Sequence, residues 1–176
     1  MPKILAINGS ATPDSSNLTL IHKVRKLIGD GFEFEVYDDL SVLPHFNTDF
    51  TDSNVPADVV KFREAVSSAD GVLICTPEYV FSIPSRLKNA IEWCVSTVVF
   101  SDKPTGLITA SASGVKGHEE LQLIMRTVQA DFNEKTTLLI QGIKGKINAE
   151  GDITHSATSE SLDQFVLSFL QLVSKR

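Results

Sequence analysis

Apolar runs alternate with segments of helical periodicity along the chain. Five short runs, rich in apolar and β-branched residues, predict strands at 3–7, 32–37, 71–75, 105–110 and 136–140. Between and after them, apolar residues recur every three or four positions, which predicts helices that include 18–28, 59–69, 87–95, 121–128 and 162–173. The run at 71–75 is apolar without alternation, as expected for a parallel strand that is covered on both faces.

Five strands that alternate with five helices predict a parallel sheet with helices on both faces. Right-handed crossovers leave two main doubly wound arrangements, and five strands favour the flavodoxin-like order 2-1-3-4-5. No internal repeat or low-complexity linker interrupts the pattern, so residues 1–176 are expected to form a single domain. Strands 1, 3 and 4 are neighbours in this order, and the loops after them meet at the carboxyl edge, where such sheets bind ligands.

Composition and charge narrow the class of partner. The hydrophobic content of 42% and charged content of 22% are ordinary for a soluble globular protein. A net charge of -6, without a basic stripe, argues against a nucleic acid or an anionic membrane as partner. No apolar segment approaches the length that spans a bilayer, and the N-terminal residues are typical of a first strand rather than a signal peptide.

The cysteines and histidines give no sign of a metal or redox centre. Cys75 and Cys94 lie in apolar contexts without CxxC spacing, so we expect reduced core thiols in a cytoplasmic protein. The four histidines are scattered without ligand spacing, which argues against a metal site.

The first loop at the predicted carboxyl edge, NGSATPDSSN (8–17), is rich in hydroxyl groups, contains no cation and opens a helix. A phosphate here would be held by free backbone N–H groups and the helix dipole, with added donors from Ser10, Thr12, Ser15 and Ser16. The absence of GxGxxG and GxxxxGK excludes the Rossmann dinucleotide site and the P-loop. An ordinary capped helix start remains the alternative for this loop taken alone.

The second loop lies within TPEYVFSIPSRLKNAIEW (76–93). Pro77 and Pro84 each fix a backbone angle, which predicts a stiff, preformed surface. Tyr79 and Phe81 offer flat apolar surfaces to an aromatic ligand. Glu78 either orients a ligand or is a solvated acid, and the solvated acid is favoured. The helix that follows is expected to bury a stripe that comprises Leu87, Ala90, Ile91, Cys94 and Val95.

The third loop, ASASGVKGH (110–118), combines small residues with Gly114 and Gly117, which let a backbone approach a ligand closely. A flexible connector is the alternative for this loop alone. Each of the three loops at this edge has features suited to a ligand. Together they favour one shared binding site over three unrelated structural explanations.

Other chemistries that use similar topologies are not supported. The acids and lysine of a receiver domain are missing, no GxSxG elbow is present, and the first loop lacks the cysteine of a low-molecular-weight phosphatase. A site that holds a phosphate at one end and a planar ring at the other remains, which describes flavin mononucleotide (FMN).

Four stretches resemble motifs of the NADPH-dependent FMN reductase family, whose members include quinone, chromate and azo-dye reductases with a flavodoxin-like fold. They are GSATPDSSN (9–17, near GSxRxxSxN), DLSVLPHFNTD (39–49, near DLxxLPxFNxD), TPEYVFSIPSRLKNAIEW (76–93, near TPEYNxSxPGxLKNAIDW) and SASGVKGH (111–118, near SxSxGxxGG). The second and third matches are highly specific. The strand plan extends the similarity to the whole chain.

The resemblance implies a set of FMN-binding residues. Ser10, Ser15, Ser16 and Asn17 would hold the phosphate, Pro77, Glu78 and Tyr79 with Ser82 would line the isoalloxazine, and Ser111 and Gly114 would approach its other edge. Thr12, Val80 and Phe81 complete the expected cofactor-binding set. The chain departs from the family pattern at Thr12 (often Arg), Val80 (usually Asn), Ser85 (Gly) and His118 (Gly), which leaves FMN affinity and acceptor preference open.

The activity implied by the resemblance is an FMN-dependent NAD(P)H oxidoreductase. Hydride would pass from NADPH or NADH to the flavin and then to a quinone, azo, metal-oxyanion or free-flavin acceptor. No side chain is needed as acid or base, so no catalytic residue is predicted. His118 either donates a proton to a quinone or lies on the surface, and the surface position is favoured.

The resemblance also implies a homodimer or homotetramer. The apolar segment 95–100 (VSTVVF) fits either a subunit contact or a buried helix end. The alternative function is a flavodoxin-like electron carrier or a non-enzymatic flavoprotein, although such carriers tend to be far more acidic than -6. The physiological acceptor, the choice of nicotinamide and the oligomer size are not fixed by the sequence.

Overall fold

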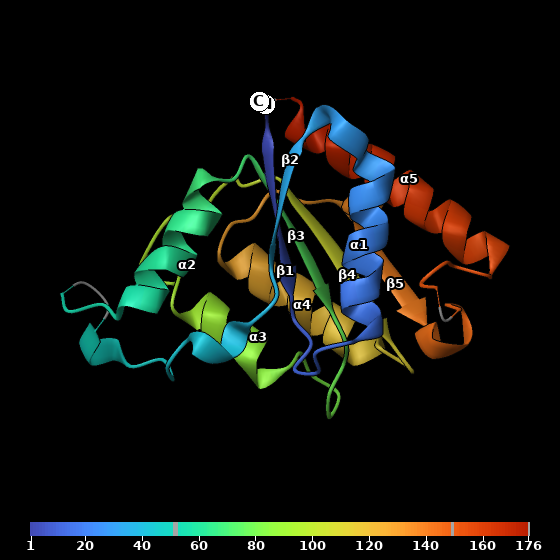
Figure 1. Cartoon of the computed structure of the whole chain (residues 1–176). Coiled ribbons are helices and arrows are strands. Elements are labelled where there is room, and N and C mark those ends of the chain that lie inside the picture. Colours follow the sequence, from blue (N-terminus) through green and yellow to red (C-terminus); the bar gives the residue numbers. More distant parts are fainter. Residues whose placement is uncertain (51–52, 149, 176) are drawn as a thin grey trace.

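The computed structural model describes residues 1–50, 53–148 and 150–175. Its centre is a five-stranded parallel sheet in the order β2-β1-β3-β4-β5, which confirms the predicted arrangement. The strands are β1 (Lys3–Asn8), β2 (Glu33–Tyr37), β3 (Gly71–Thr76), β4 (Thr105–Ser111) and β5 (Thr137–Gln141). The α-helices are α1 (Ser16–Ile28), α2 (Ala57–Ser68), α3 (Ser85–Glu92), α4 (Val115–Thr127) and α5 (Ser156–Val173), as Figure 1 shows.

Alternate residues of the central strands feed two separate cores. In β1, Leu5 and Ile7 pack in the core that includes residues of α2, α3 and α4, whereas Ile4 and Ala6 pack with residues of α1 and α5. All six residues of β3 are buried, which agrees with the uninterrupted apolar run in its sequence. Figure 1 shows α1 and α5 together on one side of the sheet.

The end of α3 differs from the predicted buried stripe. The helix ends at Glu92, and the N–H groups of Cys94 and Val95 donate to the carbonyls of Ile91 and Glu92, three residues back. This tighter winding rotates Val95 away from the core. Its side chain is 63% exposed while Cys94 is buried, so the prediction that Val95 belongs to the buried stripe is wrong.

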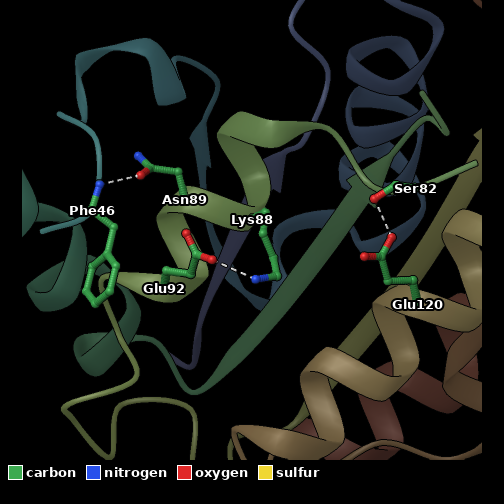
Figure 2. Close-up of polar contacts among 6 residues, drawn as sticks. All are labelled: Phe46, Ser82, Lys88, Asn89, Glu92 and Glu120. Carbon is green, nitrogen blue, oxygen red and sulfur yellow. Dashed lines mark hydrogen bonds and ion pairs between the residues drawn. The ribbon is translucent and has the colours of Figure 1, made fainter. Parts of the chain in front are cut away.

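Two of the sequence motifs are joined through α3. The Asn89 side chain accepts a hydrogen bond from the Phe46 N–H (2.8 Å) and donates to the Pro44 carbonyl (2.9 Å), which also accepts from the indole of Trp93 (2.8 Å). Figure 2 shows the Phe46–Asn89 contact beside the Lys88–Glu92 ion pair on the same helix. The 39–49 loop is therefore fixed to the helix that follows the second loop.

Both cysteines are buried free thiols. Burial raises the pKa of Cys75 and of Cys94, so both thiols are held in the protonated form. This agrees with the expectation of core thiols.

Candidate functional site

A cavity of about 620 Å³ opens at the carboxyl edge of the sheet. It brings together the loop after β1, the start of α1, the loop after β3, the end of β4 and the turn after β5. Its lining comprises Ser10, Thr12, Asp14, Ser15, Ser16, Asn17, Pro77, Tyr79, Ala110, Ser111, Ala112, Gly142, Ile143, Lys144 and Gly145. Eight of the residues expected at the cofactor site are in this set, namely Ser10, Thr12, Ser15, Ser16, Asn17, Pro77, Tyr79 and Ser111.

The first turn of α1 contains backbone N–H groups that are not used within the described part of the chain. Ser15 is the N-cap, and its hydroxyl accepts from the Leu18 N–H at 3.2 Å, while its carbonyl accepts from Thr19. The N–H groups of Ser16 and Asn17 have no acceptor among the residues that the structure describes. The loop is therefore a capped helix start that still presents free donors and the positive end of a dipole to an anion.

The side chain of Asn17 is occupied inside the protein. It is buried, donates to the Ala110 carbonyl at 3.2 Å and accepts from the Cys75 thiol at 3.3 Å. These bonds fix the start of α1 to β3 and β4. The donor that Asn17 offers to a ligand is therefore its backbone N–H.

Gly9 begins the first loop in a space too small for a side chain. Its N–H donates to the Cys75 carbonyl at 2.8 Å. A Cβ atom added at Gly9 would lie 2.5 Å from Oγ1 of Thr76 and 2.9 Å from Cδ2 of Leu87. The loop after β1 is consequently pressed against the end of β3.

The second loop is a two-residue hairpin. Tyr79 and Ser82 form an antiparallel bridge, with N–H to carbonyl distances of 2.9 and 3.1 Å. Val80 and Phe81 between them both have positive φ angles, of 54° and 59°. Positive φ at both central positions is typical of a type I′ turn, which favours Asn, Asp and Gly. The Asn of the family motif thus matches the backbone at position 80, whereas Val80 does not.

The tip of this hairpin lies outside the cavity lining. Val80 is 95% exposed and Phe81 is 75% exposed, and neither lines the cavity. The structure therefore does not bring these two expected site residues to the other eight.

Replacing Val80 with Asn is expected to stabilise the protein by about 1 kcal/mol, since a β-branched residue in the left-handed region is strained and Asn tolerates it. Urea denaturation measures the effect. The matched control is Val60→Asn on α2, which changes another exposed valine that has no positive φ and should shift stability by less than about 0.5 kcal/mol. Equal stability of Val80→Asn and the wild type would show that the positive φ at Val80 is not strained.

Glu78 joins the second and third loops. Its carboxylate accepts from the Gly114 N–H at 3.2 Å and from the Gly117 N–H at 2.8 Å, at the N-terminal end of α4. A carboxylate is favoured there by the helix dipole. The favoured prediction of a solvated acid is wrong, because the acid satisfies two backbone donors of another loop. Gly117 permits the approach, since an added Cβ would lie 3.1 Å from Cβ of Glu78.

Glu120 is a site-supporting residue that sequence reasoning missed. Its Oε2 accepts from the Ser82 hydroxyl at 2.5 Å and from the Ile83 N–H at 3.0 Å, so α4 holds the base of the hairpin (Figure 2). Ser82 is thereby engaged with α4 and lies outside the cavity lining, as do Glu78 and Gly114. The sequence gives no signal that separates Glu120 from its exposed neighbour Glu119.

Tyr79 lies at the rim between the first and second loops. Its hydroxyl is 3.4 Å from the Ser10 hydroxyl, and the residue is 40% exposed. The hydrogen bond with Ser10 lowers the pKa of the Tyr79 phenol, and the positive charge of Lys144 acts in the same direction. The phenol oxygen therefore contacts the first loop and feels the positive charge of the turn after β5.

His118 is half-buried rather than on the surface, so the favoured prediction for it is wrong. Its Nδ1 lies 2.9 Å from the Thr109 hydroxyl, which is fully buried on β4. His118 lies on α4, which packs against β4 and brings the imidazole to Thr109. Burial lowers the pKa of His118, because the charged imidazolium is poorly solvated there.

Protonation of His118 is expected to make stability pH-dependent. The unfolded chain has a histidine pKa of about 6.5 and the folded pKa is lower, so the unfolded state binds more protons below about pH 6.5. The free energy of unfolding should therefore fall as pH drops from 7.5 to 5.5. The fall should be smaller in the His118→Gln variant. Urea unfolding at both pH values tests this, with His22→Gln on an exposed part of α1 as the control. An identical fall in His118→Gln and wild type would contradict the prediction.

The described residues contain no cluster of three or more His, Cys, Asp or Glu side chains that could hold a metal ion. Across the same part of the chain, no helix has the length and apolar content needed to cross a membrane.

The fold and the cavity together define a flavodoxin-like α/β protein in which the start of α1 and Tyr79 line one cavity at the carboxyl edge of the sheet. Residues 2–141 match the family model of the NADPH-dependent FMN reductases. The chain belongs to this family.

Relatives and solved structures agree with this assignment. A 2-hydroxy-1,4-benzoquinone reductase from a Burkholderia species is 32% identical over 181 residues, which cover 99% of this chain and 97% of the relative. An NAD(P)H-dependent FMN reductase of Pseudomonas aeruginosa is 31% identical over 180 residues, covering 99% and 96%. The structure of FerB, a flavoenzyme NAD(P)H:(acceptor) oxidoreductase from Paracoccus denitrificans, superimposes with a TM-score of 0.79 at 25% identity and covers 99% of this chain and 98% of FerB.

Proposed function

We propose that the protein is an FMN-dependent NAD(P)H oxidoreductase that reduces quinone-type acceptors. The observation that carries the proposal is the cavity that is lined by hydroxyl side chains, Tyr79 and the first turn of α1. The N–H groups of Ser16 and Asn17 in that turn have no acceptor in the described part of the chain. Family membership and the quinone and FMN reductases among the relatives support the same activity.

The donor set suits FMN. Its phosphate requires several N–H and O–H donors, and Ser10, Thr12, Ser15 and Ser16 supply hydroxyls beside the free donors of the first helical turn. Its ring requires a flat apolar neighbour, which Tyr79 and Pro77 provide. A volume of about 620 Å³ is within the range of cofactor pockets.

Each part of the chain then has a defined task. The first loop and α1 hold the phosphate, Pro77 and Tyr79 flank the ring, and Ser111 lines the opposite side. Glu78 and Ser82 act indirectly, because their bonds to α4 position the second loop. Bound FMN supplies the hydride chemistry, and the protein supplies orientation and electrostatics.

The proposal extends to the electron donor, the oligomeric state and the cellular location of the protein. NADPH or NADH is the electron donor, and the protein works in the cytoplasm as a homodimer or homotetramer. The exposed valines of the 95–100 segment, Val95 and Val98, support a subunit contact there. The whole chain acts as one domain.

The decisive experiment uses the purified protein loaded with FMN. NADPH and NADH oxidation is followed at 340 nm with 1,4-benzoquinone as acceptor, and the bound flavin is identified after denaturation. We expect bound FMN and sustained turnover, with the same protein stripped of flavin as control. Bound FMN without oxidation of either nucleotide would favour an electron carrier and contradict the proposal.

A further inference from the structure

The first loop (8–17), which is proposed to hold the phosphate and is called the phosphate loop below, contains no cationic side chain. Thr12 stands where the family motif often has Arg, and residues 8–17 contain no Lys or Arg. Among the described residues that line the cavity, only Asp14 and Lys144 carry charge. An anion in this space therefore meets a single cationic side chain, and it comes from a different loop.

Lys144 is held at the cavity by the turn that follows β5. This turn is a single 3-10 turn, Ile143–Gly145, which begins after Gly142. Gly142 has a φ of 64°, which favours glycine, and its N–H donates to the Ala112 carbonyl of the third loop at 3.1 Å. The Gly145 N–H closes the turn on the Gly142 carbonyl at 3.0 Å. Lys144 thus projects from a backbone that is fastened to the edge of the site.

The ammonium group of Lys144 is available to a ligand. Its side chain is exposed, and it forms no ion pair with a carboxylate within residues 1–50, 53–148 and 150–175. Its charge acts on the Tyr79 hydroxyl, which is 3.4 Å from the Ser10 hydroxyl. The charge of Lys144 and the Ser10 hydroxyl of the first loop therefore act on the same group, the Tyr79 hydroxyl.

We propose that Lys144 is a cofactor-binding residue that supplies the cation for the flavin phosphate, in the role vacated at Thr12. The inference rests on the proposed function, because it assumes that FMN occupies the cavity. A phosphate dianion at the α1 start would gain a charge-assisted hydrogen bond from the ammonium group and partial compensation for Asp14. The site keeps the family's phosphate chemistry with the cation moved from the loop after β1 to the turn after β5.

The test compares two flavins that differ only in the phosphate. Dissociation constants of FMN and riboflavin are measured by flavin fluorescence titration of the apoprotein. We expect Lys144→Ala to weaken FMN binding about tenfold, leave riboflavin binding unchanged and reduce the salt dependence of FMN binding. Lys144→Arg should restore most of the FMN affinity.

Lys146→Ala is the matched control. It removes the same charge two residues along the same loop, from a position outside the cavity lining, and should leave both dissociation constants unchanged. Urea unfolding of each variant checks that the fold is retained.

Three results would overturn the inference, and they are distinguishable. Equal FMN affinity in Lys144→Ala and wild type would remove Lys144 from the site while leaving the proposed function intact. Equal weakening of FMN and riboflavin would show that Lys144 does not act through the phosphate. Failure of the wild type to bind either flavin would defeat the proposed function itself.

Discussion

Glu78→Ala is expected to lower the free energy of unfolding by about 2–4 kcal/mol and to weaken FMN binding more than tenfold. The substitution removes the carboxylate that accepts from the Gly114 and Gly117 N–H groups at 3.2 and 2.8 Å. Both N–H groups lie at the start of α4, beneath the second loop. Loss of the carboxylate therefore leaves two partly buried N–H groups without this acceptor. Urea denaturation and FMN fluorescence titration measure the two effects.

Two variants sharpen the interpretation of Glu78. Glu78→Gln keeps the shape and one acceptor oxygen but removes the charge, so it should lie between the wild type and Glu78→Ala. Glu119→Ala removes an exposed carboxylate from α4, the helix whose N-terminal end Glu78 contacts. Its ion pair with the exposed Lys116 is screened by solvent, so stability should be almost unchanged. If Glu78→Ala and Glu119→Ala behave alike, Glu78 does not hold the two loops together.

Gly9→Ala is expected to destabilise the protein by about 1–3 kcal/mol and to displace the phosphate loop. The added methyl group would lie 2.5 Å from Oγ1 and 2.7 Å from Cβ of Thr76. Thr76 is fully buried at the end of β3, so it has little freedom to move. The strain is relieved by shifting the first loop, which carries the hydroxyl donors, and FMN affinity should fall with stability.

Gly31→Ala is the matched control for Gly9→Ala. An added Cβ at Gly31 has nothing within 4 Å, and its φ is not in the left-handed range. Alanine there should be neutral or stabilise by up to about 1 kcal/mol, because it restricts the unfolded chain. Unchanged stability and FMN affinity in Gly9→Ala would mean that the loop accommodates the methyl group without cost.

The site is assembled by bonds between loops rather than within them. Glu78 ties the second loop to the third, Glu120 ties the hairpin base to α4, and Gly142 ties the turn after β5 to the third loop. Such cross-links hold a binding surface in place before the ligand arrives and so reduce the entropy lost on binding. The strained hairpin at Val80 and Phe81 is retained within this frame.

Much of the fold was predictable because it depends on local periodicity. The buried run in β3, the helical spacing in α1 and the alternation of strands with helices each arise from neighbouring residues, and together they favour the observed strand order. The hydroxyl-rich first loop was also recognisable, since it directly precedes a helix. These features are encoded within short stretches of chain, so a sequence pattern was sufficient to detect them.

The tertiary structure decided the features that depend on distant partners. Glu78 and the N–H groups it satisfies are 36 and 39 residues apart in sequence, and Thr109 and His118 meet only because α4 folds back on β4. The predictions of a solvated Glu78, a surface His118 and a buried Val95 failed because each considered a residue without its packing neighbours. By itself, the sequence determined the strands and helices, favoured their order in the sheet and contained the four stretches that resemble the family's motifs. Only the folded chain brought Lys144 to the cavity that the first loop lines, because the turn after β5 is bonded to the third loop.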